Sequence, residues 1–161
     1  MKKFTREEIE KARRFFRSKG FEEVEESFLG SNFSYFVLPQ RLEPALPDFV
    51  YRCTGEPYDG HVFGISDSVD PMFRPYAVFH EYVEFMKIGI DAPGRCVRAL
   101  NVELAAVPKN KKPEYVKMRR NFFRNLVDYC SKQPDKYPAE DVAEFKRSLS
   151  RLEEIANELG V

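Results

Sequence analysis

The sequence predicts an α+β fold, in which a small and mostly antiparallel sheet packs against helices. Residues 21–66 alternate loosely between apolar and polar side chains, which is typical of strands. Residues 71–159 instead follow a period of about 3.6, which is typical of amphipathic helices. The length of 161 residues favours one domain. We therefore expect a single domain over 1–161, sheet-rich over 21–66 and helical over 71–159.

The first expected element is a helix near the N-terminus. Thr5 and Glu8 have the spacing of a capping box, in which each side chain accepts a hydrogen bond from the other residue's backbone amide. Gly20 is suited to end this helix, because glycine adopts the left-handed backbone conformation at low cost. Apolar residues follow the capping box at helical spacing: Ile9, Ala12, Phe15 and Phe16.

Four strands are expected after this helix. Segments 21–28 and 33–38 predict a hairpin, because they alternate on either side of turn-forming residues. Segments 49–53 and 61–66 predict two further strands around a glycine-containing turn. The connection between the two pairs is expected to be a loop, marked by Pro39, Pro44 and Pro47.

Four helices are expected after the strands. Their predicted ranges are 71–88, 94–107, 113–132 and 139–159. Pro71 or Pro75 can open the first of them, because proline is tolerated in a first turn. Apolar residues of the last helix step three and four apart and form one narrow stripe, which predicts packing against other helices.

Charge and composition argue against several classes of protein. The chain has 26 basic and 26 acidic residues, so no net field attracts nucleic acid or an anionic membrane. The N-terminal residues lack the apolar core of a signal peptide, and no stretch is apolar enough to span a membrane, so we expect a cytoplasmic protein. Cys53, Cys96 and Cys130 are far apart, which argues against a disulfide framework and against a cysteine-rich zinc site.

The most informative stretch runs from His80 to Glu84. Residues four apart on a helix lie on one face, about one turn apart, so these two side chains can reach one metal ion. Glu81 lies beside them and could act as a base. The surrounding helix is apolar almost all round, which predicts burial, and buried polar groups need partners. A divalent cation would satisfy them.

Glu103 is the expected third ligand. It is the only acidic residue between Asp91 and Glu114. It belongs to a helical row of small side chains that would permit close approach to the motif helix: Cys96, Ala99 and Ala106. His61, the other histidine of the chain, is a weaker candidate at the start of an expected strand.

The motif His80-Glu81-x-x-Glu84 resembles the His-Glu-x-x-His helix of the zincin metallopeptidases. In their glutamate-ligand branch, which includes thermolysin, a third ligand follows on a later helix, roughly twenty residues beyond the second histidine. Glu103 follows Glu84 by 19 residues. The resemblance covers residues 61–107 and implies a zincin-like core, with the metal held by His80, Glu84 and Glu103. Glu81 would then polarise a bound water for attack on a peptide or amide carbonyl.

The chain departs from this family at Glu84, where the family has its second histidine. One histidine and two carboxylates make a harder and more anionic site, which suits manganese or iron as well as zinc. An alternative needs no metal at all. In it, His80, Glu84 and Lys87 form an ordinary solvated stripe. Glu103 then pairs with Arg95, Arg98 or another basic side chain.

Two further features carry alternatives of their own. Basic residues between 109 and 124 alternate with aromatic residues, a pattern that can bind a phosphate backbone, although the aromatic side chains fit a core face better. Cys96 stands near a helix start, where a thiolate is stabilised, although a small core cysteine is the simpler interpretation.

The sequence therefore predicts a divergent zincin-like, metal-dependent hydrolase that acts on a peptide or protein substrate and uses zinc, manganese or iron. The first alternative is a non-catalytic protein-interaction domain. The second, which the balanced charge disfavours, is a nucleic-acid-binding protein that uses the basic helix 113–132. The sequence does not define the substrate or the oligomeric state.

Overall fold

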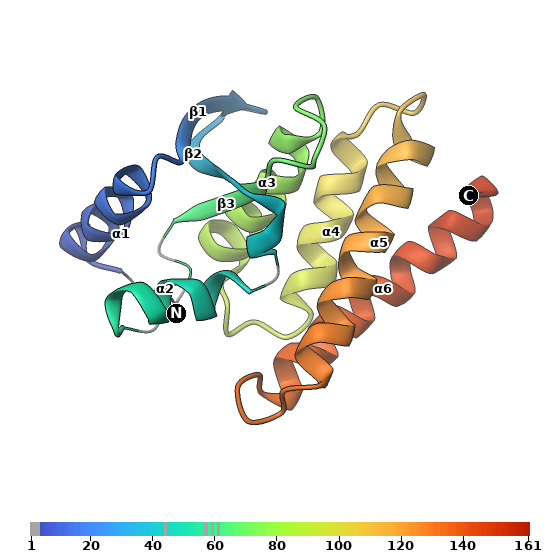
Figure 1. Ribbon diagram of the computed structural model, residues 1–161. Helices are drawn as coiled ribbons and strands as arrows, with labels where there is room; N and C mark the ends of the chain where they lie inside the picture. Colours follow the sequence, from blue (N-terminus) through green and yellow to red (C-terminus); the bar gives the residue numbers. More distant parts are fainter. Residues whose placement is uncertain (1–3, 44, 57, 59, 61) are drawn as a thin grey trace. The chain divides into compact units, whose positions relative to one another are not determined.

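The structure is a computed structural model that describes residues 4–43, 45–56, 58, 60 and 62–161. Among these residues it contains six α-helices and one three-stranded sheet, which confirms the predicted α+β class (Figure 1). The chain divides into two compact units, Met1–Tyr82 and Val83–Val161. The first unit holds the sheet and three helices, and the second unit is helical. That the two form a single domain stays a prediction.

The first helix, α1 (Arg6–Ser18), begins at the predicted capping box. The Thr5 hydroxyl accepts a hydrogen bond from the Glu8 amide at 3.1 Å, and the Glu8 carboxylate accepts one from the Thr5 amide at 2.7 Å. The chain leaves the helix at Gly20, whose φ of 77° is left-handed. The structure therefore confirms this predicted helix. It was predictable because residues close in sequence define both of its ends.

The sheet has the strand order β1-β2-β3 and is mixed. β1 (Glu22–Phe28) and β2 (Ser31–Leu38) form the predicted antiparallel hairpin around the turn Leu29-Gly30. β3 (Phe63–Ser66) pairs with β2 in parallel, so the expectation of a mostly antiparallel sheet is wrong for this pairing. The physical reason is a crossover: between β2 and β3 the chain passes through a 3-10 turn, η1 (Gln40–Leu42), and a helix, and returns in the same direction.

The predicted strand at 49–53 is also wrong, because these residues are helical. They belong to α2 (Leu46–Thr54), which carries Pro47 in its first turn and ends at Gly55 with a φ of 72°. A short apolar stretch fits a strand or a helix equally well, and here the flanking proline and glycine match a helix start and a helix end. Pro44, which was expected to mark a loop, lies outside the described residues.

Side chains on both faces of β2 build the core of the first unit. Phe36 points to one face, where it packs with Phe16 of α1 and with residues of α2. Phe33 points to the other face, where its ring centroid lies 6.4 Å from that of Phe79 on α3 (Arg74–Tyr82). Because successive strand residues alternate between faces, the unit has three layers, with α1 and α2 on one side of the sheet and α3 on the other.

The second unit begins with a π-helical segment, η2 (Val83–Ile88), and continues with three helices. These are α4 (Arg95–Ala106), α5 (Lys112–Ser131) and α6 (Ala139–Leu159), close to the predicted ranges. α6 lies beside both α4 and α5, so the three helices form one bundle (Figure 1). Its fully buried residues include Leu100, Val116 and Leu152.

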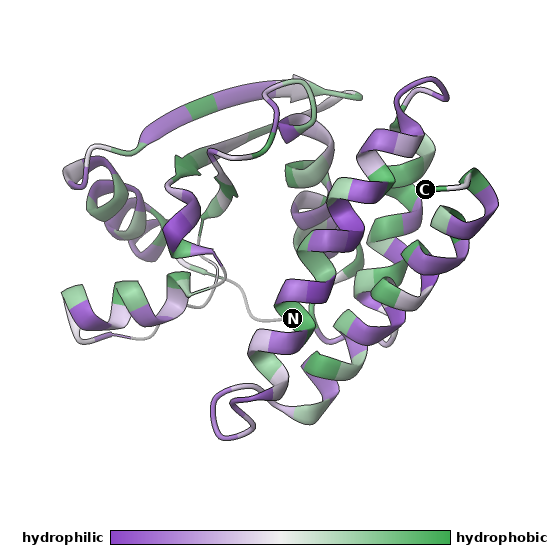
Figure 2. Ribbon diagram, turned by 45° about the vertical axis from the view of Figure 1, so that its right-hand side comes forward, coloured by the Kyte–Doolittle hydropathy of each residue, from purple (hydrophilic) through white to green (hydrophobic). Residues whose placement is uncertain are grey.

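The helices of the second unit are amphipathic. α5 and α6 have 20 and 21 residues, and hydrophilic residues recur along both of them (Figure 2). Such a pattern suits a helix with one face in a protein core and the other in water. Within the described part of the chain, no helix combines enough length with enough hydropathy to span a membrane.

Candidate metal centre

The motif lies on one helical run whose hydrogen-bonding pattern changes partway along. α3 carries His80 and Glu81 and passes without a break into η2, which carries Glu84. The Glu84 carbonyl accepts a hydrogen bond from the Gly89 amide at 2.8 Å, with the five-residue spacing of a π-helix. π-helical turns are rare and frequently lie at functional sites. The apolar period predicted a helix here and contained no signal for this change.

His80 and Glu81 differ in their exposure. His80 is 1% exposed, which confirms the predicted burial of this part of the motif helix. Glu81 is only half-buried. Burial, together with the negative charge of Glu81, raises the pKa of the Tyr58 hydroxyl, which donates a hydrogen bond to the Val62 carbonyl. Glu81 therefore lies close enough to Tyr58 to act on it electrostatically within the first unit.

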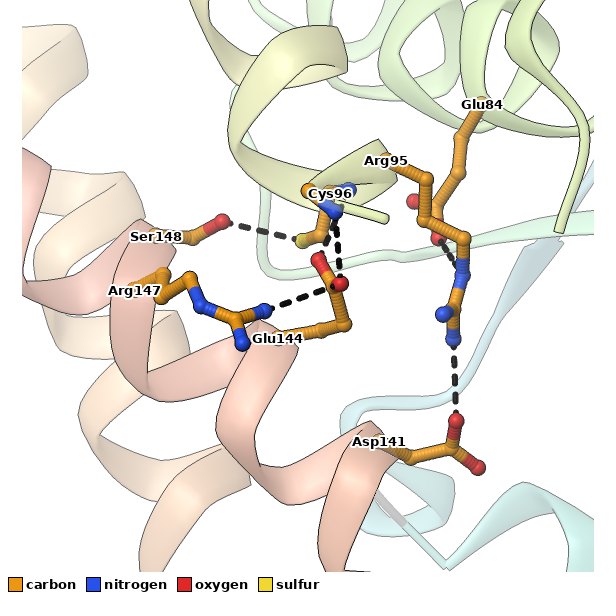
Figure 3. A network of polar contacts seen from close by, with 8 residues as sticks. Glu84, Arg95, Cys96, Asp141, Glu144, Arg147 and Ser148 are labelled. Carbon is orange, nitrogen blue, oxygen red and sulfur yellow. Dashed lines mark hydrogen bonds and ion pairs between the residues drawn. The ribbon is translucent and has the colours of Figure 1, made fainter. Parts of the chain in front are cut away.

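Glu84 is a buried carboxylate held by an arginine. One of its oxygens accepts a hydrogen bond from Nε of Arg95 at 3.0 Å, and Nη2 of Arg95 reaches Asp141 of α6, also at 3.0 Å (Figure 3). Burial alone would lower the pKa of Arg95, but the hydrogen bond to Asp141 and the charge of Glu84 hold it above its ordinary value. The guanidinium therefore stays charged and offsets part of the negative charge of Glu84.

Cys96 lies in the first turn of α4, near Glu84. A carboxylate oxygen of Glu84 and the sulfur of Cys96 lie within 4.8 Å of each other, so small side-chain adjustments would let both bind one ion. Cys96 is 2% exposed, and its sulfur accepts a hydrogen bond from the Ser148 hydroxyl at 3.0 Å (Figure 3). The sequence did not suggest Cys96 as a candidate ligand, because no known spacing connects it to Glu84. The only signal for it was its place on the same small-residue row as Glu103.

A carboxylate from α6 holds the start of α4. Gly94, the N-cap residue of α4, has a φ of 68° and no side chain that could cap the helix. Instead, Glu144 accepts hydrogen bonds from the Gly94 amide at 2.8 Å and from the Cys96 amide at 3.4 Å. Arg147 donates a further hydrogen bond to Glu144 at 2.9 Å. A negative charge stabilises a helix N-terminus, so Glu144 caps α4 from the neighbouring helix.

Glu103, the predicted third ligand, is fully buried on α4 and takes partners from α5. Its carboxylate accepts a hydrogen bond from the Tyr115 hydroxyl, and Nε of Arg119 lies 2.6 Å from Oε1. The Arg119 guanidinium also lies 5.1 Å from the ring centroids of Phe122 and Phe123, within the range of a cation–π contact. The alternative expectation that Glu103 pairs with a basic side chain is confirmed, with Arg119 as the partner.

The chain has one further histidine and two further cysteines. His61 lies outside the described residues. None of the three cysteines forms a disulfide, and Cys53 is exposed on α2. Cys130 is buried on α5, where burial raises the pKa of its thiol to about 11. Cys130 therefore stays protonated near neutral pH and is a poor ligand.

The basic helix α5 uses several of its cations within the protein. Besides the pair between Arg119 and Glu103, Arg124 lies 2.6 Å from Glu153 of α6. Phe123 is 2% exposed, so its ring belongs to the core, as the pattern of the helix favoured. These internal pairs leave less of the basic strip for a phosphate backbone.

Within the helical unit, the site offers a carboxylate oxygen and a thiol sulfur, two groups that bind zinc once they are deprotonated. In the sequence, the buried imidazole of His80 stands four residues before Glu84.

Comparisons of this chain with protein-family models, with curated proteins and with solved structures find no match.

Proposed function

We propose that this protein binds a divalent cation, preferably zinc, through His80, Glu84 and Cys96. The observation that carries the proposal is the close approach of the Glu84 carboxylate and the Cys96 sulfur, both buried, at the start of α4. His80 is included as the ligand that the sequence predicts, because it stands four residues before Glu84 in the motif. A set of one nitrogen, one oxygen and one sulfur ligand suits zinc and leaves a fourth position for water.

Cys96 replaces Glu103 in this ligand set because Arg119 contacts both carboxylate oxygens of Glu103, at 2.6 and 3.3 Å, whereas Nε of Arg95 contacts one oxygen of Glu84. The ion pair with Arg119 would have to break before Glu103 could bind a metal, and a broken buried pair costs several kcal/mol, about 3–5. A thiolate is also softer than a carboxylate, which favours zinc over manganese. The role of Glu103 as a ligand stays a prediction of the sequence.

We further propose that the bound ion serves hydrolysis of a peptide or amide bond, with Glu81 as the base. The support is the resemblance of the motif to the zincin helix, in which the glutamate after the first histidine has this role. The free thiols fit the cytoplasmic location expected from the sequence, because reducing compartments keep cysteines unpaired.

Cobalt(II) substitution tests the ligand set. Cobalt bound to a thiolate shows a charge-transfer absorption that cobalt bound only to oxygen and nitrogen lacks. We expect this absorption in the metal-free protein after addition of one equivalent of cobalt, and its loss in Cys96→Ser. Cys130→Ser is the matched control, because Cys130 is equally buried but lies on a different helix, α5. A spectrum without thiolate absorption in the unmodified protein would overturn the proposal.

Glu103→Gln separates the two ligand sets. If Cys96 is the third ligand, this variant should retain about one zinc ion per chain and lose stability. Loss of zinc together with an unchanged cobalt spectrum in Cys96→Ser would instead establish Glu103 as the ligand.

The hydrolase part of the proposal has a separate test. Zinc-loaded protein should cleave unstructured peptides, with products identified by mass spectrometry. Glu81→Gln should keep the metal and lower the rate by about 100-fold or more, the usual effect of removing a general base. Zinc binding without any cleavage would contradict hydrolysis and leave metal binding intact.

The second candidate function is a non-catalytic protein-interaction domain. The observation in its favour is that arginines neutralise both Glu84 and Glu103, so neither acid requires a metal. Under this proposal, purified protein contains no stoichiometric zinc, and His80→Ala leaves the binding of a protein partner unchanged.

A further inference from the structure

Two polar residues of α6 contact Cys96 and are not among the proposed ligands. Glu144 and Ser148 lie one helical turn apart and are 5% and 0% exposed. Glu144 accepts a hydrogen bond from the Cys96 amide, and Ser148 donates one to the Cys96 sulfur (Figure 3). Other buried residues of α6 are apolar, such as Val142 and Leu152. Polar groups in such a stripe are costly unless their hydrogen bonds are made, so these contacts account for their placement.

We propose that Glu144 and Ser148 are positioning residues that hold the Cys96 sulfur near the Glu84 carboxylate, an inference that rests on the proposed metal site. Glu144 fixes the backbone of Cys96 through its bonds to the start of α4. Ser148 fixes the other end of the residue, because its hydroxyl lies 3.0 Å from the sulfur. A side chain held at both its amide and its sulfur has little freedom to turn away from an ion.

Helix capping alone does not explain this pair. It accounts for Glu144, whose carboxylate lies at the N-terminus of α4, but the hydroxyl of Ser148 is directed at a sulfur. Partners of this kind orient a metal ligand while leaving other lone pairs of the ligand atom for the ion. Their removal typically weakens metal binding by about 10–100-fold.

The test compares two serines of the same helix. Ser148→Ala removes the hydroxyl next to Cys96, whereas Ser150→Ala, the control, changes an exposed serine two residues later. Zinc affinity is measured by competition with a chromophoric chelator. We expect about 10–100-fold weaker binding in Ser148→Ala and no change in Ser150→Ala. Ser148→Thr keeps the hydroxyl and should bind zinc like the unmodified protein. If Ser148→Ala folds poorly, weak zinc binding by a well-folded Ser148→Thr would overturn the positioning role.

A second readout needs no metal. Three-bond NMR couplings report the side-chain rotamer of Cys96 in the metal-free protein. A single rotamer is expected in the unmodified protein and in Ser150→Ala, and averaging among rotamers in Ser148→Ala.

The two proposals fail in different ways. If the unmodified protein binds zinc and Ser148→Ala binds it equally well, the positioning role is overturned and the metal site stands. If the unmodified protein binds no zinc, the proposed function is overturned, and the rotamer measurement alone decides whether Ser148 holds the Cys96 side chain. A single Cys96 rotamer in Ser148→Ala would overturn the positioning role in that case.

Discussion

Among single residues, the buried acids of the helical unit stand out because each has an arginine partner. Glu103 is bound by Arg119, and Glu84 by Arg95. Moving a charge out of water is costly, and a partner of opposite charge with good hydrogen-bond geometry offsets much of that cost. The sequence showed that Glu103 was an isolated acid. Its partner, Arg119, lies 16 residues further along the chain, and the sequence pattern did not indicate which of several basic residues would pair with it.

Replacement of Arg119 by Met should destabilise the protein strongly. The variant leaves the Glu103 carboxylate buried without its cation, so the free energy of unfolding should fall by about 3–5 kcal/mol in urea denaturation at neutral pH. The double variant Glu103→Leu/Arg119→Met should recover much of this loss, because neither charge is then buried. A single variant as stable as the unmodified protein would show that the pair contributes nothing.

Glu23 on β1 should make stability depend on acid pH. Burial alone would raise the pKa of this carboxyl, but hydrogen bonds from Arg13 and Arg17 hold it below its ordinary value of 4.5. A lowered folded-state pKa stabilises the protein above the unfolded-state pKa, and the effect is lost as the pH falls through the folded-state pKa.

The unmodified protein should therefore exceed Glu23→Gln in unfolding free energy by about 1–2 kcal/mol at pH 7, and this difference should shrink below about pH 4. Urea denaturation across this pH range measures it. Glu22→Gln, at the exposed neighbouring position, is the control and should show little change at either pH. A difference for Glu23→Gln that stays constant down to pH 3 would contradict the assignment.

Among helices and strands, those with both ends encoded locally were predictable, and those that depend on distant partners were not. α1 and α6 follow from an apolar period between recognisable start and stop residues. The segment that became α2 was too short for its period to decide, and the direction of β3 depended on the crossover before it. The direction of a strand depends on the edge at which the chain returns to the sheet. The residues of the strand itself do not indicate this direction.

The hairpin turn between β1 and β2 offers a stabilising substitution. Leu29 has a φ of 49° and is 63% exposed, so it adopts a left-handed conformation without burying its side chain. This conformation costs a residue with a Cβ about 1–2 kcal/mol, whereas Asn tolerates it and Asn-Gly is favoured in two-residue turns. Leu29→Asn should raise the unfolding free energy by about 1 kcal/mol and the melting temperature with it. Leu29→Ala keeps the strain and should bring no such gain, and equal effects of the two variants would refute this explanation.

For the protein as a whole, the proposed zinc site predicts a change in thermal stability. A ligand that binds the folded chain and not the unfolded chain stabilises it by mass action. Zinc at 100 times its dissociation constant should therefore add about 2.7 kcal/mol to the unfolding free energy. Calorimetry with zinc and with a chelator measures this shift, which Cys96→Ser should abolish and Cys130→Ser should retain. An identical melting temperature in both conditions would speak against a folded-state zinc site.

The candidate site was predictable only in part. The burial of His80 and Glu84 followed from apolar neighbours at helical spacing, and the structure confirms it for both. Glu103 is buried as well, on a row of small side chains. Their partners did not follow from the pattern, because side-chain contacts between helices depend on how the helices cross. Glu103 pairs with Arg119, and Cys96 lies within 4.8 Å of Glu84 although no motif connects them.

Local residues thus encoded the helices of this chain other than α2, its first hairpin and the burial of His80 and Glu84, since periodicity and end signals act over a few neighbouring positions. Packing among α4, α5 and α6 decided which buried acids meet an arginine and which group lies beside Glu84. Those pairings join residues many positions apart, and only a folded bundle brings their side-chain atoms within bonding distance.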